Sequence, residues 1–243
     1  MINTVTFNGV NFWEDLGAAL SAPISYPLPA EIKESITIKG ANGSLTESTG
    51  YFNTLEIEAE FKTLIGHGSD PDTHTFKGLK RKINLLFNNI INNRLMFSDV
   101  PNRYYKVSSC GLASVTKISE HEATFKVIFK CDPFLYNPSE RPITSTGVIE
   151  YNGDIPNAPF IKFVTTGGGQ TTVHCNDKQI TFESQRNGTV EVNMNPYSII
   201  TIDGKPVKST GTQPVLKHGR NEIRIIGITF DNVEIIKNER YLG

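Results

Sequence analysis

The chain alternates hydrophobic and polar residues over many short stretches, which is the pattern of half-buried β-strands. The clearest stretch is 55–61, where hydrophobic positions are separated by three glutamates, Glu56, Glu58 and Glu60. Asn8-Gly9 is typical of a type I′ hairpin turn between two such stretches. In the first half we predict strands at 5–7, 10–12, 36–38, 55–61, 95–97, 104–107, 115–118 and 123–131.

One segment follows a helical period instead. Its hydrophobic residues recur at the spacing of one helix face, and they are Phe76, Leu79, Ile83, Leu86, Phe87 and Ile90. The basic residues of the segment lie largely off this stripe. We therefore predict an amphipathic helix over about 74–92, with Asp72 or Thr73 as its N-cap and Asn92-Asn93 at its end.

Pro, Ser, Thr and Gly concentrate over 137–147, which indicates a domain boundary. Beyond it the pattern shows only strands and turns. The predicted strands are 148–151, 160–164, 171–175, 180–182, 189–192, 199–202, 222–226 and 233–236, a spacing typical of a β-sandwich or barrel. The sequence thus predicts a β-rich domain with one helix over 1–136, a linker over 137–147 and a second β-domain over 148–243.

Composition and charge narrow the classes of partner. The 243 residues include 24 Lys and Arg against 25 Asp and Glu, a net charge of −1. No global positive field attracts nucleic acid or an anionic membrane, so we expect protein partners. The N-terminus shows no signal peptide and no long apolar run occurs, so the protein is expected to stay where it is made. The three cysteines are odd in number and widely spaced, which predicts free thiols.

The strand that contains Cys131 raises the question of a reactive thiol. Alternation places Phe125, Val127, Phe129 and Cys131 on one side of this strand. A thiol in such an apolar row is expected to be buried and a poor nucleophile. Because proline lacks an N–H, Asp132-Pro133 is expected to end the strand.

Three other motifs invite a chemical interpretation. The segment 65–75 holds two histidines and two aspartates, but their spacing suits a polar loop better than a metal site. Gly167-Gly168-Gly169 lacks the Lys-Ser/Thr ending of a phosphate loop and is expected to form a hairpin turn. His174-Cys175-Asn176-Asp177-Lys178 is faintly similar to the sugar-binding line of galectins, with lysine in place of arginine; the only tryptophan, Trp13, lies in the other domain.

No catalytic residue, cofactor site or metal site is predicted. The chain contains no nucleophile elbow, no HExxH helix and no paired-carboxylate signature, and His121 and His218 have no nucleophile nearby in sequence. We therefore do not expect an enzyme. An enzyme of an unrecognised type stays a rival interpretation, which would require that the purified protein retain a cofactor or metal.

The order of several motifs resembles the distal tail (Dit) family of long-tailed bacteriophages. In the first half these are Ile36-Thr37-Ile38-Lys39-Gly40 with Asn42-Gly43, a Tyr51-containing turn, the helix, Leu95-Met96-Phe97-Ser98-Asp99 with Tyr104-Tyr105, and Phe129-Lys130-Cys131-Asp132-Pro133-Phe134. In the second half they are Tyr151-Asn152-Gly153, Pro159 with Phe160-Ile161-Lys162-Phe163, the glycine turn at 167–169, Ile202-Asp203-Gly204, and the run 216–223. The resemblance spans nearly the whole chain.

The resemblance implies a structural protein of the virion. Its first domain is then a split-barrel-like domain that forms a hexameric ring at the tail tip, and its second a galectin-like β-sandwich. The implied partners are other copies of the chain, the tail tube protein, the tail-associated hub, lysin or fibre protein, and receptor-binding proteins. A carbohydrate-binding protein that contacts the bacterial wall through the second domain is the alternative.

Charged residues of the first domain have two interpretations. Glu56, Glu58 and Glu60 recur about 7 Å apart on one strand face, where like charges repel. They form either a solvated strand face or contacts with Lys80, Arg81 and Lys82 of a neighbouring protomer that set the ring register. The loop 65–75 is also a candidate arm of the kind that embraces the next subunit in Dit-like proteins.

Overall fold

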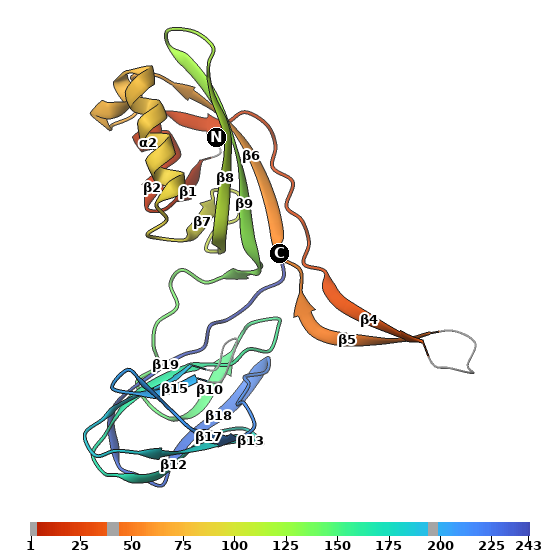
Figure 1. Cartoon of the computed structure of the whole chain (residues 1–243), viewed down its shortest axis with the longest axis vertical. Helices are drawn as coiled ribbons and strands as arrows, with labels where there is room; N and C mark the ends of the chain where they lie inside the picture. Colours follow the sequence, from red (N-terminus) through yellow and green to blue (C-terminus); the bar gives the residue numbers. More distant parts are fainter. Residues whose placement is uncertain (1–3, 38–43, 194–198) are drawn as a thin grey trace. The chain divides into compact units, whose positions relative to one another are not determined.

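The computed structural model describes residues 4–37, 44–193 and 199–243 (Figure 1). The fold is mainly β, as predicted, and the chain divides into two compact units. Unit 1 runs to Tyr136 and includes Leu242–Gly243, and unit 2 is Asn137–Tyr241. The turn predicted at 40–43, and Ile38 before it, lie outside the described residues.

Unit 1 is built on a seven-stranded antiparallel sheet that curls into a half-barrel, with the strand order β2-β1-β7-β8-β9-β6-β3. Its strands are β1 (Val5–Phe7), β2 (Val10–Asn11), β3 (Ala18–Leu20), β6 (Leu55–Leu64), β7 (Arg94–Phe97), β8 (Tyr104–Lys117) and β9 (Glu122–Tyr136). The turn between β1 and β2 has positive φ at Asn8 and Gly9, 53° and 79°, as a type I′ turn requires. The sequence pattern missed β3 and divided β8 into two strands.

Helices cover the inner face of this sheet. The predicted amphipathic helix is α2 (Phe76–Asn88), which is shorter than expected and lies beside the sheet (Figure 1). Its buried residues are Leu79, Ile83, Leu86 and Phe87, and Phe87 contacts Phe125 and Phe129 of β9. Thr75 is its N-cap, since the Thr75 hydroxyl accepts a hydrogen bond from the Gly78 N–H at 3.1 Å, and Asn89 ends it. The predicted caps are wrong because Asp72 and Thr73 lie in the preceding 3₁₀ helix η1 (Pro71–His74).

A second, short helix, α1 (Phe12–Leu16), was not predicted, because 10–12 was read as a returning strand. Asn11 caps this helix: its side-chain oxygen accepts hydrogen bonds from the N–H groups of Trp13 and Glu14. Gly17 ends it with φ 62°. The turn buries Phe12 completely, so local capping overrides the strand pattern here.

An aromatic cluster fills the space between α2 and the sheet. The ring of Phe125 stacks on Phe61 with a centroid distance of 4.8 Å and lies 6.3 Å from both Phe12 and Phe87. Phe129 contacts Phe87 at 5.9 Å. These side chains come from β6, β9, α1 and α2, so this cluster joins the helices to the sheet.

The alternation predicted for β9 is confirmed, and Cys131 is fully buried in its apolar row. Burial, with a smaller contribution from Asp132, raises the pKa of the Cys131 thiol to about 12, which makes it a poor nucleophile. The predicted end of the strand at Pro133 is wrong, because β9 continues to Tyr136. The pairing register with β8 shifts at this point, and a bulge of that kind tolerates the missing N–H of proline.

A separate two-stranded sheet belongs to unit 1. It is formed by β4 (Glu31–Thr37) and β5 (Ser44–Phe52), and neither strand pairs with the seven-stranded sheet. Tyr51, which was predicted to lie in a turn, is part of β5. The ring of Phe52 packs against Phe134 of β9, with their centroids 5.1 Å apart.

Unit 2 is a sandwich of two five-stranded antiparallel sheets, with the orders β10-β18-β12-β13-β17 and β16-β15-β14-β11-β19. The strands are β10 (Gly147–Tyr151), β11 (Phe160–Thr165), β12 (Gly169–Cys175), β13 (Lys178–Ser184), β14 (Thr189–Asn193), β15 (Ile199–Ile202), β16 (Lys205–Val207), β17 (Ser209–Gly211), β18 (Gly219–Ile226) and β19 (Phe230–Ile236). The short edge strands β16 and β17 were not predicted.

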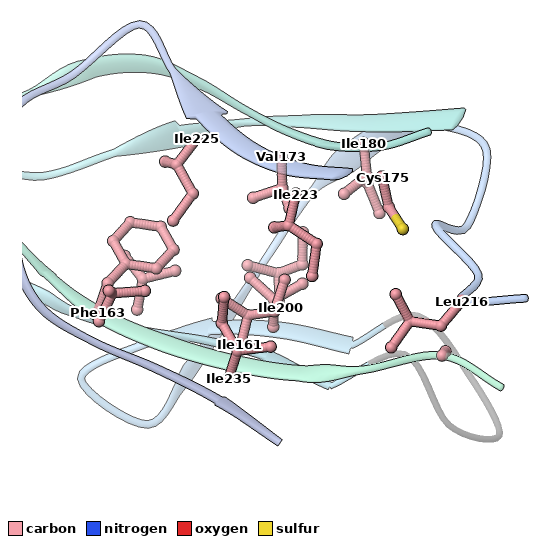
Figure 2. Packing of buried hydrophobic residues seen from close by; sticks show 14 of the residues in the cluster. Ile161, Phe163, Val173, Cys175, Ile180, Ile200, Leu216, Ile223, Ile225 and Ile235 are labelled. Atoms are coloured by element: carbon pink, nitrogen blue, oxygen red, sulfur yellow. The ribbon is translucent and has the colours of Figure 1, made fainter. Parts of the chain in front are cut away.

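Hydrophobic side chains from both sheets interdigitate between them (Figure 2). Phe163, Ile161 and Ile235 come from one sheet, and Val173 and Ile223 come from the other. Gly167 and Gly168 lie in the connection from β11 to β12, and Gly169 is the first residue of β12; the two strands lie in different sheets. The hairpin turn predicted there is therefore wrong, and the segment crosses between the sheets.

A buried polar network ties the two ends of unit 2 together. Glu239 is 3% exposed, and its carboxylate accepts hydrogen bonds from Lys237, from Tyr241 at 2.5 Å and from the Asn152 N–H at 3.1 Å. Burial alone would raise the pKa of Glu239, but hydrogen bonds from Lys237 and Tyr241 lower it below its ordinary value. Nearby, Glu140 accepts the Asn238 N–H at 2.9 Å.

The segment predicted as a linker, 137–147, thus lies on unit 2. Besides the Glu140 contact, Ile143 exchanges two backbone hydrogen bonds of 2.8 Å with Ile235 of β19. Burial, followed by the neighbouring Glu239 charge, raises the pKa of Glu140, although the Asn238 N–H opposes this shift.

Candidate interaction surfaces

The histidine-containing loop 65–75 is organised by local contacts. The ring of His67 lies 4.8 Å from the ring of Trp13, and His74 Nε2 lies 3.3 Å from the Gly68 carbonyl oxygen. Asp70 caps η1. Among the described residues, no three His, Cys, Asp or Glu side chains gather as metal ligands would.

The glutamate face of β6 is paired within the chain. All three glutamates are exposed and alternate with buried residues, as predicted. Lys130 of β9 lies 3.2 Å from Glu56, and Lys126 lies 2.5 Å from Glu58. Lys126 is opposite Glu60 in the register but reaches diagonally to Glu58. Among the described residues, Glu60 has no ion-pair partner.

The basic residues of α2 lie on the solvent side of the helix. Lys80 and Arg81 are exposed, and neither forms an ion pair with a described residue. Lys82 is 2.6 Å from Asp70, and this hydrogen bond holds the pKa of the Asp70 carboxyl below its usual range. The structure therefore does not bring the predicted glutamates and basic residues together within one chain. The helix covers one face of the sheet, and the side chains of the glutamates lie on the opposite, exposed face.

The β4–β5 hairpin carries an exposed acidic pair that the sequence pattern did not identify. Glu34 and Glu47 are directly opposite each other in the strand register. Like charges in this position destabilise a hairpin. Ile32 and Ile36, also on β4, are 39% and 44% exposed. Only the pairing register shows that Glu34 and Glu47 meet, and β5 was not predicted.

The galectin-like motif of unit 2 has a structural role in the turn between β12 and β13. Asn176 has φ 57°, and its amide nitrogen donates to the Asn221 side-chain oxygen at 2.9 Å. Its own side-chain oxygen accepts the Glu222 N–H at 3.0 Å. Cys175 points into the core, and burial raises its pKa to about 11. The Asn176 side chain is thus engaged in holding the turn.

Within the described residues, no helix is long and apolar enough to cross a membrane. The charged and apolar groups described above are candidates for contacts with other proteins. They comprise the glutamate face of β6, the solvent side of α2 and the β4–β5 hairpin.

The sequence matches no protein-family model and no curated protein sequence. Solved structures do match. One is the crystal structure of the Dit (gp 19.1) protein of phage SPP1, described as a paradigm of the hub adsorption apparatus in phages that infect Gram-positive bacteria. It is 16% identical, with a TM-score of 0.50, and the match covers 93% of this chain and all of that one. At this identity the likeness shows a Dit-like fold.

Proposed function

We propose that this protein is a hub component of a phage tail tip, the distal tail protein of a long-tailed phage or of a phage-like tail element. The observation that carries the proposal is the match to a phage hub protein, which extends over 93% of this chain and the whole of the other. The motif order in the sequence independently resembles the same family. The matched protein is a structural hub component, so the proposed role is assembly and docking.

In this proposal, six copies form a ring through the domain 1–136. The segment 137–147 connects the domain 1–136 to a galectin-like domain over 148–243. The ring would join the tail tube protein to the tail-associated hub, lysin or fibre protein, and receptor-binding proteins would attach to the outer domain. The protein would reside in the virion at the tail tip.

A ring requires two different surfaces on each copy, because its interfaces are head-to-tail. Unit 1 offers groups of opposite charge on opposite sides of its sheet. Glu60, which has no ion pair with a described residue, lies on the β6 face, and Lys80 and Arg81 lie on the solvent side of α2. Since Glu56, Glu58 and Lys82 have partners in the same chain, we assign them a supporting role in the predicted contact.

The β4–β5 hairpin is the best candidate for the arm that embraces the next subunit, in place of the loop 65–75. An isolated two-stranded hairpin is marginally stable in water. This one is exposed along nearly all of β4, and it carries the opposed pair Glu34 and Glu47. A basic partner surface would relieve this repulsion, and the solvent side of α2 in the neighbouring copy supplies one.

Light scattering and negative-stain electron microscopy of the purified chain, alone and with its cognate hub protein, test the ring. A six-fold ring under either condition is the expected result. A strict monomer under both conditions would overturn the proposal.

A charge-reversal series tests the interface separately. Arg81→Glu should weaken assembly most at low salt, and the reciprocal change Glu60→Arg in the same chain should restore it. Lys205→Glu, at an exposed position of unit 2, is the matched control and should assemble normally. If Arg81→Glu assembles normally at every salt concentration, the predicted charge contact between copies is refuted, even if the protein forms rings.

A further inference from the structure

Unit 2 contains a groove of about 620 Å³ that the proposed ring does not use. One wall is the segment 144–146, and the other is the start of β19, Phe230 to Glu234. Small-molecule sites in proteins have volumes of roughly 300–1,000 Å³. The groove therefore has the size of a binding site for a short oligomer or a small molecule.

The groove arises from the way the chain crosses between the two sheets. Ile143 pairs with Ile235 at the edge of β19, after which the chain leaves that edge and starts β10 in the opposite sheet at Gly147. On the other wall, the pairing of β19 with β11 shifts register between Lys162 and Val164. Asn232 adopts φ 52° beside this bulge. A β-bulge changes the direction in which nearby side chains point, and bulges are frequent beside functional sites.

The walls are rich in hydrogen-bonding side chains that have no partner among the described residues. These six side chains belong to Thr144, Ser145, Thr146, Asp231, Asn232 and Glu234. They offer two carboxylates and an amide oxygen as acceptors, and three hydroxyls and an amide NH₂ that can donate. Among the described residues, no lysine or arginine lines the groove, and Lys162, which is opposite Glu234 in the strand register, pairs with Glu191. A ligand that offers many hydroxyl donors would satisfy this lining, whereas an anion would meet two like charges.

An aromatic residue completes the lining. Phe230 is partly exposed, and its ring is packed edge-on with the fully buried Phe163, with centroids 5.7 Å apart and an interplanar angle of 65°. Its orientation is therefore fixed by the core. A ring held beside carboxylates and hydroxyls provides apolar area for the C–H groups of a sugar ring, while the polar side chains bind its hydroxyls.

We propose that this groove binds a short saccharide that is neutral or carries an amino group. The proposal goes beyond the proposed hub function and does not depend on it, because unit 2 alone supplies every residue. It also does not involve the galectin-like motif at 174–178, whose Asn176 holds a turn. The acidic lining distinguishes this ligand class from phosphate-containing and uronic acid polymers.

The test is a titration of the full-length protein by calorimetry and saturation-transfer NMR. The probes are maltotriose, triacetylchitotriose, chitotriose and polyglycerol phosphate. Saturable binding of at least one of the three trisaccharides, with no binding of the anionic polymer, is the expected result. Binding of the polymer alone, or of none of the probes at millimolar concentration, would overturn the proposal.

Variants locate the site. Asp231→Asn combined with Glu234→Gln should weaken binding about tenfold or more, since hydrogen bonds to charged groups are among the stronger ones. Glu150→Gln combined with Glu183→Gln, at exposed positions of β10 and β13 in the opposite sheet, is the control and should bind as the natural protein does. Equal affinities of the two double variants would refute the groove as the site. So would a tri-lysine peptide that displaces the saccharide and binds more tightly. Unchanged thermal unfolding verifies that both variants are folded.

Discussion

Replacing Phe125 by alanine should show that the aromatic cluster of unit 1 stabilises its sheet and helices as one body. The side chain is 2% exposed, stacks on Phe61 and contacts Phe12 and Phe87. Truncating a buried phenylalanine costs about 3–5 kcal/mol, because apolar contacts are lost and a cavity is left. The free energy of unfolding of a native domain is only about 5–15 kcal/mol, so the variant would lose a large share of its stability.

The assay is urea unfolding followed by the fluorescence of Trp13. This is the only tryptophan in the chain and lies in α1, so its signal reports on unit 1. With a slope of about 2 kcal/mol per molar urea, the midpoint should fall by about 2 M. Phe125→Leu, which keeps most of the volume, should cost about 1.5 kcal/mol or less.

Ile118→Ala is the matched control for this experiment. Ile118 is 58% exposed in the turn between β8 and β9, so its loss should change the stability by about 0.5 kcal/mol or less. If Phe125→Ala shifts the midpoint no further than Ile118→Ala does, the aromatic cluster does not hold unit 1 together and the reasoning fails.

Four further predictions concern single residues of the two units. At pH 7, Glu239→Gln should lower the stability of unit 2 in calorimetry by about 1.5–3 kcal/mol, and this loss should vanish as the pH falls through the lowered pKa of Glu239. Glu140→Gln should be neutral or stabilising at pH 7, since the raised pKa of Glu140 means that its charged form loses stability as the pH rises; a loss equal to that of Glu239→Gln would contradict this. Gly78→Ala should destabilise unit 1 by about 2 kcal/mol or more despite the better helix propensity of alanine, because the new Cβ would lie 1.9 Å from the Asp72 carbonyl oxygen, and a gain in the urea midpoint would refute this clash. With Ellman's reagent at pH 8, Cys110 should react first because it is partly exposed, whereas equal rates for all three thiols would contradict the burial of the other two.

The parts of the fold that the sequence predicted well are those in which hydrophobic residues recur with a clear period. The alternation over 55–61 is confirmed residue by residue in β6, and the same holds for the apolar row of β9. The helical stripe predicted the buried face of α2, since burial against a sheet leaves this pattern in the sequence. The β-sandwich of unit 2 followed from strand spacing.

The missed elements are short or lack a buried face. β3 has three residues, and β4 is exposed along nearly its whole length, so β3 was missed and only the end of β4, at 36–37, was predicted. α1 is a single helical turn that is capped by Asn11. The sequence showed only the alternation of Val10 and Phe12 there, which predicted a strand instead. The passage of β9 through Pro133 depends on a bulge, which is set by pairing with β8.

The candidate interaction surfaces depended on contacts that sequence spacing does not contain. Repulsion along Glu56, Glu58 and Glu60 suggested a need for an external partner. The register with β9 places Lys126 and Lys130 across from these glutamates and supplies much of that charge within the chain. Such pairs are exposed and contribute about 1 kcal/mol or less each.

Charge compensation within the chain therefore indicates which surfaces are left for assembly. The glutamate face of β6 has partners for two of its three charges, so Glu60 is the member that has no ion pair with a described residue. The hairpin pair Glu34 and Glu47 has neither burial nor a cation to offset its repulsion among the described residues. A sequence that keeps two opposed carboxylates on an exposed hairpin, and exposed cations on α2, is best understood if the two surfaces meet in different copies. In the proposed ring, the hairpin would then share the basic side of α2 with Glu60, the one glutamate of the β6 face that has no ion pair with a described residue.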